Sequence, residues 1–276
     1  MSSELLNDDT ADDAFERCVT VVIPAYNEQE SVTHLADCLT EFKTQSAGQY
    51  EFKFVIVDDA SQDDTISKIG EVFSEWQDFE IVRHKENQGV AAAIMTGIRH
   101  ADTPLVASMD FDCTYRPVQM LNLLPMIGQA DVVTGSPYHP DGEVKNVPEW
   151  RLIFSRGASW AYRRVMKNKL HTYTSCFRVY RRNSVSDLKL RNGGFVGVVE
   201  LLWRISCRDG EVVEVPATLD VRKFGQSKMR TIQVTLQHLR LLSLAMSYRI
   251  CRPFLSGKAK ANSRKPDIST RRSANA

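Results

Sequence analysis

The stretch Pro104-Leu-Val-Ala-Ser-Met-Asp-Phe-Asp112 joins a strand-like apolar run to two carboxylates one residue apart. Such residues point to opposite faces of a regular strand, but both can converge on one cation where the backbone turns at the strand's end. Mg²⁺ and Mn²⁺ prefer oxygen ligands and commonly combine protein carboxylates with phosphate oxygens. Asp110 and Asp112 therefore predict a metal site that bridges the protein to a diphosphate. The alternative is an acid-rich structural turn.

The composition is typical of a soluble globular protein. The 276 residues are 43% hydrophobic and 25% charged, enough for one large α/β domain or two small ones. The six cysteines show neither a C-x-x-C pair nor zinc-ligand spacing, which favours a reducing compartment over a disulfide framework. We expect no secretory leader and no transmembrane helix, because no apolar stretch has the length or the flanks that either needs.

The two ends of the chain differ in charge. Residues 1–17 are acidic and residues 253–276 are basic, and both segments are expected to be disordered tails around a domain at 18–230. The basic tail serves either solubility or attraction to an anionic membrane surface. Residues 231–252 predict an amphipathic helix, interrupted by polar residues, that packs on the domain rather than spanning a bilayer.

Strand and helix patterns alternate along the first part of the chain. Strands are expected near 18–23, 51–57, 79–83 and 105–109, with helices near 27–42, 65–76 and 90–98 between them. This alternation predicts an α/β fold with a mostly parallel central sheet flanked by helices. Ligands of such sheets bind beyond the carboxyl ends of the strands. Acidic residues follow three strand ends, at Glu28, at Asp58 and Asp59, and at Asp110 and Asp112, so one shared site is predicted there.

The motifs in this order resemble those of family 2 glycosyltransferases with the GT-A fold. They are Val22-Ile-Pro-Ala-Tyr-Asn-Glu28, Val57-Asp-Asp-Ala-Ser-Gln-Asp-Asp-Thr65, Asn87-Gln-Gly89 and Asp110-Phe-Asp112. Later segments are similar to the dolichol-phosphate or polyprenol-phosphate mannosyltransferase group. They are Ser155-Arg-Gly-Ala158, Thr174-Ser-Cys-Phe-Arg-Val-Tyr-Arg181, Gly194-Phe195 with Glu200, and Arg222-Lys-Phe-Gly-Gln-Ser-Lys228. The resemblance covers most of the chain, from about Val19 to Met229.

The resemblance implies roles on the donor side. Pro24, Tyr26, Glu28 and Asp58 would hold the nucleoside, since carboxylates accept hydrogen bonds from ribose hydroxyls and base N–H groups. Asp110 and Asp112 would hold Mg²⁺ or Mn²⁺ on the diphosphate as it leaves. A weaker oxygen ligand is expected from Thr114. The alternative for Glu28, and equally for Asp59, is that the carboxylate caps a helix.

The resemblance also implies an acceptor site rich in arginine, whose planar fork fits phosphate oxygens. Its members would be Arg151, Ser155, Arg178, Glu200, Arg222, Ser227 and Lys228, with Arg222 also counted as catalytic and Arg156 left open. For Glu200 a structural or sugar-orienting role is favoured over catalysis, because an ionised phosphate acceptor barely needs a general base. Pro137 departs from the group, which usually carries Arg there, so the acceptor's identity is open; His139 and Lys145 are near in sequence.

The favoured function is that of an inverting, metal-dependent glycosyltransferase that moves a hexose onto a polyprenyl or dolichyl phosphate. Mannose from GDP-mannose is the expected donor, and the enzyme is expected at the cytoplasmic face of a membrane, attached peripherally or through a membrane partner protein. The alternatives are UDP-glucose as donor, a hydroxyl acceptor, or a catalytically silent sugar-nucleotide-binding subunit. No nucleic-acid partner is expected. A dinucleotide-binding dehydrogenase is disfavoured because no G-x-G-x-x-G follows the first strand.

Overall fold

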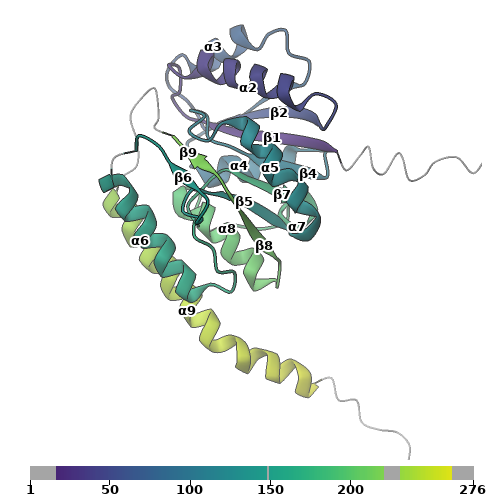
Figure 1. The fold of residues 1–276 in the computed structure, drawn as a ribbon. Helices are drawn as coiled ribbons and strands as arrows, with labels where there is room; N and C mark the ends of the chain where they lie inside the picture. Colours follow the sequence, from purple (N-terminus) through teal and green to yellow (C-terminus); the bar gives the residue numbers. More distant parts are fainter. Residues whose placement is uncertain (1–16, 148, 221–230, 263–276) are drawn as a thin grey trace, which may run out of the picture.

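The computed structural model describes residues 17–147, 149–220 and 231–262, and within the helices the side chains of 149–151, 154, 231–232 and 250–262 lie outside the description (Figure 1). The described chain forms a seven-stranded sheet in the order β3-β2-β1-β4-β7-β5-β8. The strands are β1 (Cys18–Ala25), β2 (Glu51–Asp58), β3 (Phe79–Arg83), β4 (Leu105–Ser108), β5 (Val132–Ser136), β7 (Arg178–Arg181) and β8 (Val212–Pro216). All neighbours are parallel except β7, which runs antiparallel to β4 and β5. The predicted α/β class with a mostly parallel sheet is confirmed.

Helices cover both faces of the sheet (Figure 1). Helices α2 (Val32–Ser46), α3 (Thr65–Val72) and α5 (Met120–Leu123) lie on one face, together with the 3₁₀ turns Pro117–Gln119 and Leu124–Gln129. The other face is covered by α4 (Val90–His100), α6 (Glu149–Val165), α7 (Arg182–Val185), α8 (Phe195–Cys207) and α9 (Thr231–Asn262). A small second sheet pairs β6 (Glu143–Val144) with β9 (Thr218–Leu219) in parallel.

The continuous apolar run of β1 follows from this two-sided cover. Val21 and Ile23 pack into the layer under α2, whereas Val22, between them, packs into the layer under α4. All three side chains are fully buried. A strand with one wet face alternates apolar and polar residues, whereas a strand covered on both faces is mostly apolar throughout. Thr20, a polar residue within β1, is fully buried and its Oγ1 lies 2.7 Å from Oγ1 of Thr103.

Close approach of α4 to the sheet depends on Gly97. A Cβ added at this glycine would lie 2.3 Å from Cγ1 of Val22, well inside van der Waals contact. Ala93, one turn before Gly97 on the same side of the helix, is also small and fully buried. The run of small residues in this helix therefore sets a short distance between helix and strand.

Helix α9 packs along α6 and α8 and continues beyond the body of the domain (Figure 1). The phenol oxygen of Tyr162 on α6 lies 2.9 Å from Nδ1 of His238, and Leu241 is buried at the same junction. The helix expected at 231–252 lies within α9, which ends at Asn262 rather than 252. Residues 253–262 were expected to belong to a tail; they include the run Lys258-Ala-Lys-Ala261, whose residues have high helix propensity.

The acidic tail expected at the start of the chain and most of the basic tail expected at its end lie outside the described residues, which leave out 1–16 and 263–276. In the described part of the chain, no helix combines the length and the apolar content that crossing a membrane requires.

Replacing Gly97 with alanine tests the close packing of α4. We expect Gly97→Ala to lower the free energy of unfolding by about 1–3 kcal/mol, because the new methyl group overlaps Val22. The matched control is Gly70→Ala in α3, where an added Cβ meets no atom within 4 Å and improved helix propensity should stabilise by up to about 1 kcal/mol. Urea denaturation measures both variants. Equal changes of the same sign would contradict the packing argument.

Candidate active site

Three neighbouring parallel strands end at the same edge of the sheet, and each is followed by a non-glycine residue with positive φ. Asn27 after β1 has φ 53°, Ala60 after β2 has φ 62°, and Cys113 after β4 has φ 54°. Non-glycine residues with positive φ are uncommon, and they gather at functional sites where the surrounding structure holds them. The three sharp turns bring the loops that carry the predicted acidic residues to one edge.

The loops after β1 and β2 are stitched together by hydrogen bonds. The backbone N–H of Asn27 donates to Oγ of Ser61 at 2.9 Å, and its side-chain oxygen accepts from the backbone N–H of Gln62 at 2.7 Å. The backbone N–H of Glu28 donates to Oγ1 of Thr65 at 2.7 Å. These bonds hold the predicted nucleoside loop, which also contains Pro24 and Tyr26, directly beside the end of β2.

Asp58 is fully buried at the end of β2. Its Oδ2 lies 3.0 Å from Nε of Arg83, and the carboxylate accepts from the backbone N–H of Ser61. Pairing with a guanidinium and a backbone N–H compensates the cost of burying this charge. A nucleoside bound here would have to share the carboxylate with these two partners.

The carboxylate of Asp59 has partners different from those of Asp58. The sequence predicted only a helix-capping alternative for Asp59, without naming the groups that it binds. Its carboxylate accepts from the backbone N–H groups of Gln88 and Gly89 at 2.8 and 2.7 Å, and it contacts Nδ1 of His84 at 2.7 Å. Nε2 of that histidine in turn lies 2.9 Å from Oγ1 of Thr96. Asp59 therefore holds the two residues that lead into α4, rather than capping the following α3.

The Asp110-Phe-Asp112 segment forms a tight turn after β4. The backbone N–H of Cys113 donates to the carbonyl of Asp110 at 3.3 Å, and that of Thr114 donates to Oδ1 of Asp112 at 3.2 Å. Both aspartates are half-buried. In the described part of the chain, no three His, Cys, Asp or Glu side chains are grouped to hold a metal ion. Two carboxylates on one turn fit Mg²⁺ or Mn²⁺ when a diphosphate supplies further oxygens.

A cavity of about 180 Å³, called here the catalytic cavity, opens directly beside this turn. Its polar lining consists of Asp110 and of hydroxyl groups from Thr114, Tyr115, Tyr138, Ser155, Thr172, Thr174 and Ser175. Several hydroxyls are ordered in pairs, with Ser155 and Thr174 at 2.7 Å and Ser136 and Thr172 at 2.8 Å. A small pocket lined by hydroxyls, aromatic rings and one carboxylate matches the hydrogen-bonding groups of a sugar.

The catalytic cavity brings together only some of the predicted site residues. Asp110, Thr114 and Ser155, which were among the predicted residues, line it. Thr172 was missed, although the hydroxyl-rich run from 171 to 176 was a signal for it. Tyr138 was noticed only as part of the segment with Pro137. The predicted Arg222, Ser227 and Lys228, and the side chain of Arg151, lie outside the described residues.

Arg178 does not reach the acceptor side, contrary to expectation. The side chain is 1% exposed, and its two terminal nitrogens donate to the carbonyls of Val198 and Tyr173 at 2.7 and 2.8 Å. The guanidinium instead ties β7 to α8 and to the loop before β7. Position in the motif could not reveal this, because a strand residue faces either the site or the core depending on register.

Glu200, for which a structural or sugar-orienting role was favoured over catalysis, is likewise bonded within the protein. It is 1% exposed and accepts from the backbone N–H groups of Arg191 and Asn192 and from Nε of Arg204. Burial by itself raises the pKa of Glu200. The hydrogen bonds outweigh it and hold the pKa below the ordinary value of 4.5.

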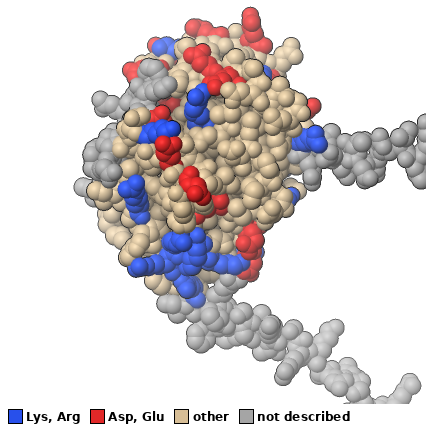
Figure 2. Space-filling view, viewed as in Figure 1, with Lys and Arg blue, Asp and Glu red and all other residues tan. Residues whose placement is uncertain are grey.

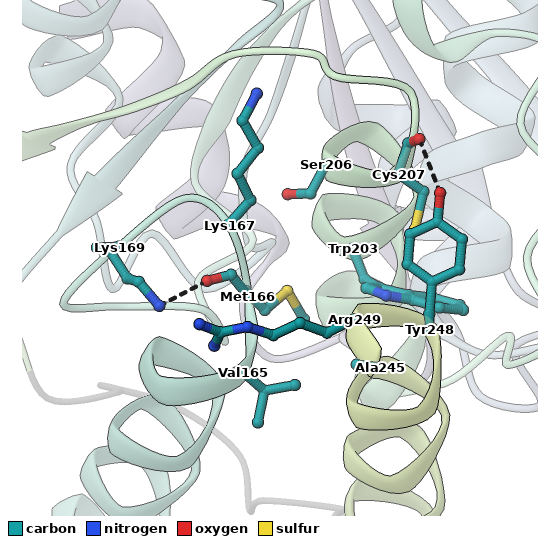
Figure 3. A pocket seen from close by; sticks show the side chains of 10 residues that line it. All are labelled: Val165, Met166, Lys167, Lys169, Trp203, Ser206, Cys207, Ala245, Tyr248 and Arg249. Atoms are coloured by element: carbon teal, nitrogen blue, oxygen red, sulfur yellow. Dashed lines mark hydrogen bonds between the residues drawn. The ribbon is translucent and has the colours of Figure 1, made fainter. Parts of the chain in front are cut away.

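A larger cavity of about 460 Å³ lies away from this site, between α6, α8 and α9 (Figure 3). Lys and Arg side chains gather over the C-terminal end of α6 (Figure 2). Two of the cations that line the cavity are committed to the end of that helix: Lys169 donates to the carbonyl of Met166 at 2.8 Å, and Arg249 donates to that of Arg164. Cations at a helix C-terminus stabilise its carbonyls and dipole, so this cluster is accounted for by the fold.

Comparison with known proteins agrees with the site. The sequence profile of glycosyl transferase family 2 matches residues 20–189. A dolichol-phosphate mannosyltransferase of Pyrococcus furiosus is 30% identical over 227 residues, which is 80% of this chain and 62% of that protein. The chain thus spans less than two thirds of that relative's length. A polyprenol monophosphomannose synthase of Mycolicibacterium smegmatis is 31% identical over 218 residues, 76% of this chain and 80% of the relative.

The fold is shared with solved glycosyltransferase structures. Glucosyl-3-phosphoglycerate synthase of Mycobacterium tuberculosis, in complex with Mn²⁺, UDP and glucosyl-3-phosphoglycerate, superposes with a TM-score of 0.60 at 15% identity. The match covers 84% of this chain and 80% of that one. The fold and the family match together place the chain in the class of glycosyltransferases. The chain belongs to glycosyl transferase family 2, and the resemblance stated from its motifs is confirmed.

The depressed pKa of Glu200 predicts a pH dependence of stability. A carboxylate with a lowered folded-state pKa stabilises the fold above its unfolded pKa and loses that contribution as pH falls through the folded value. We expect Glu200→Gln to lower the free energy of unfolding at pH 7 by about 1–3 kcal/mol. The gap to wild type should narrow as pH falls below 4.5.

Thermal melts at several pH values between 7 and 3 measure this gap. The matched control is Glu71→Gln, at an exposed position of α3, which should follow wild type throughout. A Glu200→Gln gap that stays constant or widens as the pH falls would contradict the account.

Proposed function

We propose that this glycosyltransferase moves a hexose from a nucleoside diphosphate sugar onto a polyprenyl phosphate, in a metal-dependent and inverting reaction. The single observation that carries the proposal is the small hydroxyl-lined cavity directly beside the Asp110 to Asp112 turn, beyond the carboxyl ends of β4 and β5. A hexose fits the cavity and its diphosphate fits the turn. Support for the acceptor comes from relatives that are named for dolichol-phosphate and polyprenol mannose transfer.

The residues divide the work in a simple way. The loops after β1 and β2, with Tyr26, Glu28 and Asp58, would bind and orient the nucleoside. Asp110 and Asp112 would hold Mg²⁺ or Mn²⁺, whose chemistry is to neutralise the leaving diphosphate. The hydroxyls of the catalytic cavity would orient the hexose, as Ser155 is itself oriented by Thr174.

A phosphate acceptor agrees with the groups found in the described part of the cavity wall. Among the described residues that line the catalytic cavity, the sole carboxylate is Asp110, which the metal would occupy. Glu200, the other acid considered, is engaged by Arg191, Asn192 and Arg204. A polyprenyl phosphate is already ionised near neutral pH, so positioning and charge neutralisation suffice to drive its attack on the sugar. A hydroxyl acceptor would need a proton acceptor here.

The proposal includes GDP-mannose as donor and peripheral attachment at the cytoplasmic face of a membrane. The donor rests on the names of the mannose-transferring relatives. Attachment is supported by large apolar side chains that are exposed on α6 and α9, namely Ile153, Trp160, Leu236, Leu239 and Met246. Exposed apolar side chains on helices that lie together are typical of surfaces that meet lipid or protein.

Radiolabel transfer from GDP-mannose to a polyprenyl phosphate tests the function. Purified full-length protein with Mg²⁺ or Mn²⁺ should move label into the organic phase, and Asp112→Asn should lower the rate roughly 100-fold or more, because the diphosphate loses its cation. The matched control is Asp102→Asn, an exposed aspartate before the opposite end of β4 that bonds Lys53 at 2.6 Å, and it should retain full activity.

Parallel reactions with UDP-glucose and with a polyprenol, which lacks the phosphate, separate the alternatives. Label entering lipid from UDP-glucose alone would replace the donor, and label entering the polyprenol would replace the acceptor. Metal-independent transfer, or full activity in Asp112→Asn, would refute the metal role. Binding of a sugar nucleotide with no transfer to any acceptor would favour a silent binding subunit.

A further inference from the structure

A second cavity, of about 440 Å³, adjoins the catalytic cavity and is called here the basic pocket. Pro137 and Tyr138 line both cavities, so these two residues form the wall between them. The rest of the lining comes from α6 and from the segments that follow β5 and α6. Besides Tyr138, its charged and aromatic members are His139, Arg156, Trp160, Arg163 and His171, and none of the described residues that line it is Asp or Glu.

Arg163 gives the clearest sign of a missing ligand. Its Nη1 is buried, and the described residues offer it no hydrogen-bond acceptor. A buried guanidinium donor without an acceptor bears the desolvation cost of its charge without the compensating bond. An anion in the pocket that Arg163 lines would supply that acceptor, and phosphate oxygens match the guanidinium fork.

Arg156 places a second cation next to the wall. Its guanidinium carbon lies 5.4 Å from the centroid of the Tyr138 ring, a cation–π contact. Burial raises the pKa of Tyr138, while Ser155 and Arg156 act against that rise. Because Tyr138 also faces the catalytic cavity, an anion held near Arg156 would lie close to the sugar site.

His139 and His171, the two histidines of the pocket, each lie next to a carboxylate that is not among the described lining residues. Nδ1 of His139 lies 3.5 Å from Oδ2 of Asp141, and Nδ1 of His171 contacts Oε1 of Glu214. The rings lie 5.8 Å apart in an edge-to-face arrangement. For His171, the carboxylate on Nδ1 fixes the ring's orientation, as it does in histidines that bind ligands through the opposite nitrogen. Nδ1 of His139 instead accepts from the backbone N–H of Asp141 at 3.2 Å. The carboxylate of Asp141 is 81% exposed and therefore well screened by solvent.

We propose that the basic pocket binds the phosphate of the acceptor, with Arg163 and Arg156 as its principal contacts and with Trp160 beside the first apolar carbons. This inference rests on the proposed function and names the part of the chain that selects a phosphate acceptor. It also accounts for Pro137, where the resembling group usually has Arg. In this chain the positive charge would come from Arg156 and Arg163 in the basic pocket instead of from position 137. The donor's diphosphate is the other source of phosphate, and it belongs at Asp110 and Asp112.

Direct binding of farnesyl phosphate, a short prenyl phosphate, tests the pocket without any catalysis. Calorimetric titration into full-length wild type should give binding that farnesol, which lacks the phosphate, does not reproduce. Arg163→Gln and Arg156→Gln should each weaken it about tenfold or more, since each removes a charge-assisted hydrogen-bonding group. The matched control is Arg208→Gln, an exposed arginine after α8 that pairs with Asp187 at 2.7 Å and is not among the described residues that line the pocket; it should bind as wild type does.

Two further measurements keep the result interpretable. Thermal melts check folding, and Arg163→Lys, which retains the charge without the fork, should bind farnesyl phosphate at an intermediate strength. In the transfer assay, the glutamine variants should raise KM for the lipid acceptor and leave the affinity for GDP-mannose unchanged. A change in nucleotide affinity alone would assign the pocket to the donor and overturn the proposal.

The proposal and the proposed function fail in different ways. Unchanged farnesyl phosphate binding in both folded glutamine variants, or no binding in wild type, overturns the pocket even if lipid-phosphate transfer is observed. Absence of transfer in wild type overturns the function, while loss of farnesyl phosphate binding in Arg163→Gln would still support an anion site at this place.

Discussion

Burial of β1 on both faces is the constraint from which the rest of this structure follows. Val21 and Ile23 face one helical layer and Val22 faces the other, so the middle of the sheet has no position that water can reach. Polar groups that the chemistry needs are thereby confined to the strand ends. Because β1, β2 and β4 are parallel neighbours, their ends share one edge, and the site is there.

The site edge is held by bonds within the chain more than by any single motif. Asp59 fixes the start of α4, Asn27 joins two loops, and Glu200 fixes the loop before α8. Each of these groups is a polar side chain bonded to backbone N–H groups, an arrangement that leaves little freedom for the loop. Rigid loops of this kind place reactive groups without reorganisation during the reaction, which is where electrostatic catalysis gains most.

Two adjoining cavities with different linings would bind the two substrates of the proposed reaction separately. The catalytic cavity offers hydroxyls and one carboxylate, whereas the basic pocket offers arginines and histidines. Tyr138 stands between them. A neutral sugar and a charged acceptor would thus be sorted by lining chemistry, with the ionised acceptor making a dedicated base unnecessary.

The sequence by itself determined the fold class and the main motifs, because apolar runs, sharp turns and acidic strand ends are local patterns. Asp110 was singled out on that basis, and Thr114 and Ser155 by the family resemblance; all three line one cavity. Tertiary structure alone decided which way longer side chains point. Arg178 is buried in the core, Asp59 bonds the residues that lead into α4, and Arg163 lines a cavity. Local patterns could not reveal these contacts, because strand register and helix packing bring together groups that are far apart in the chain.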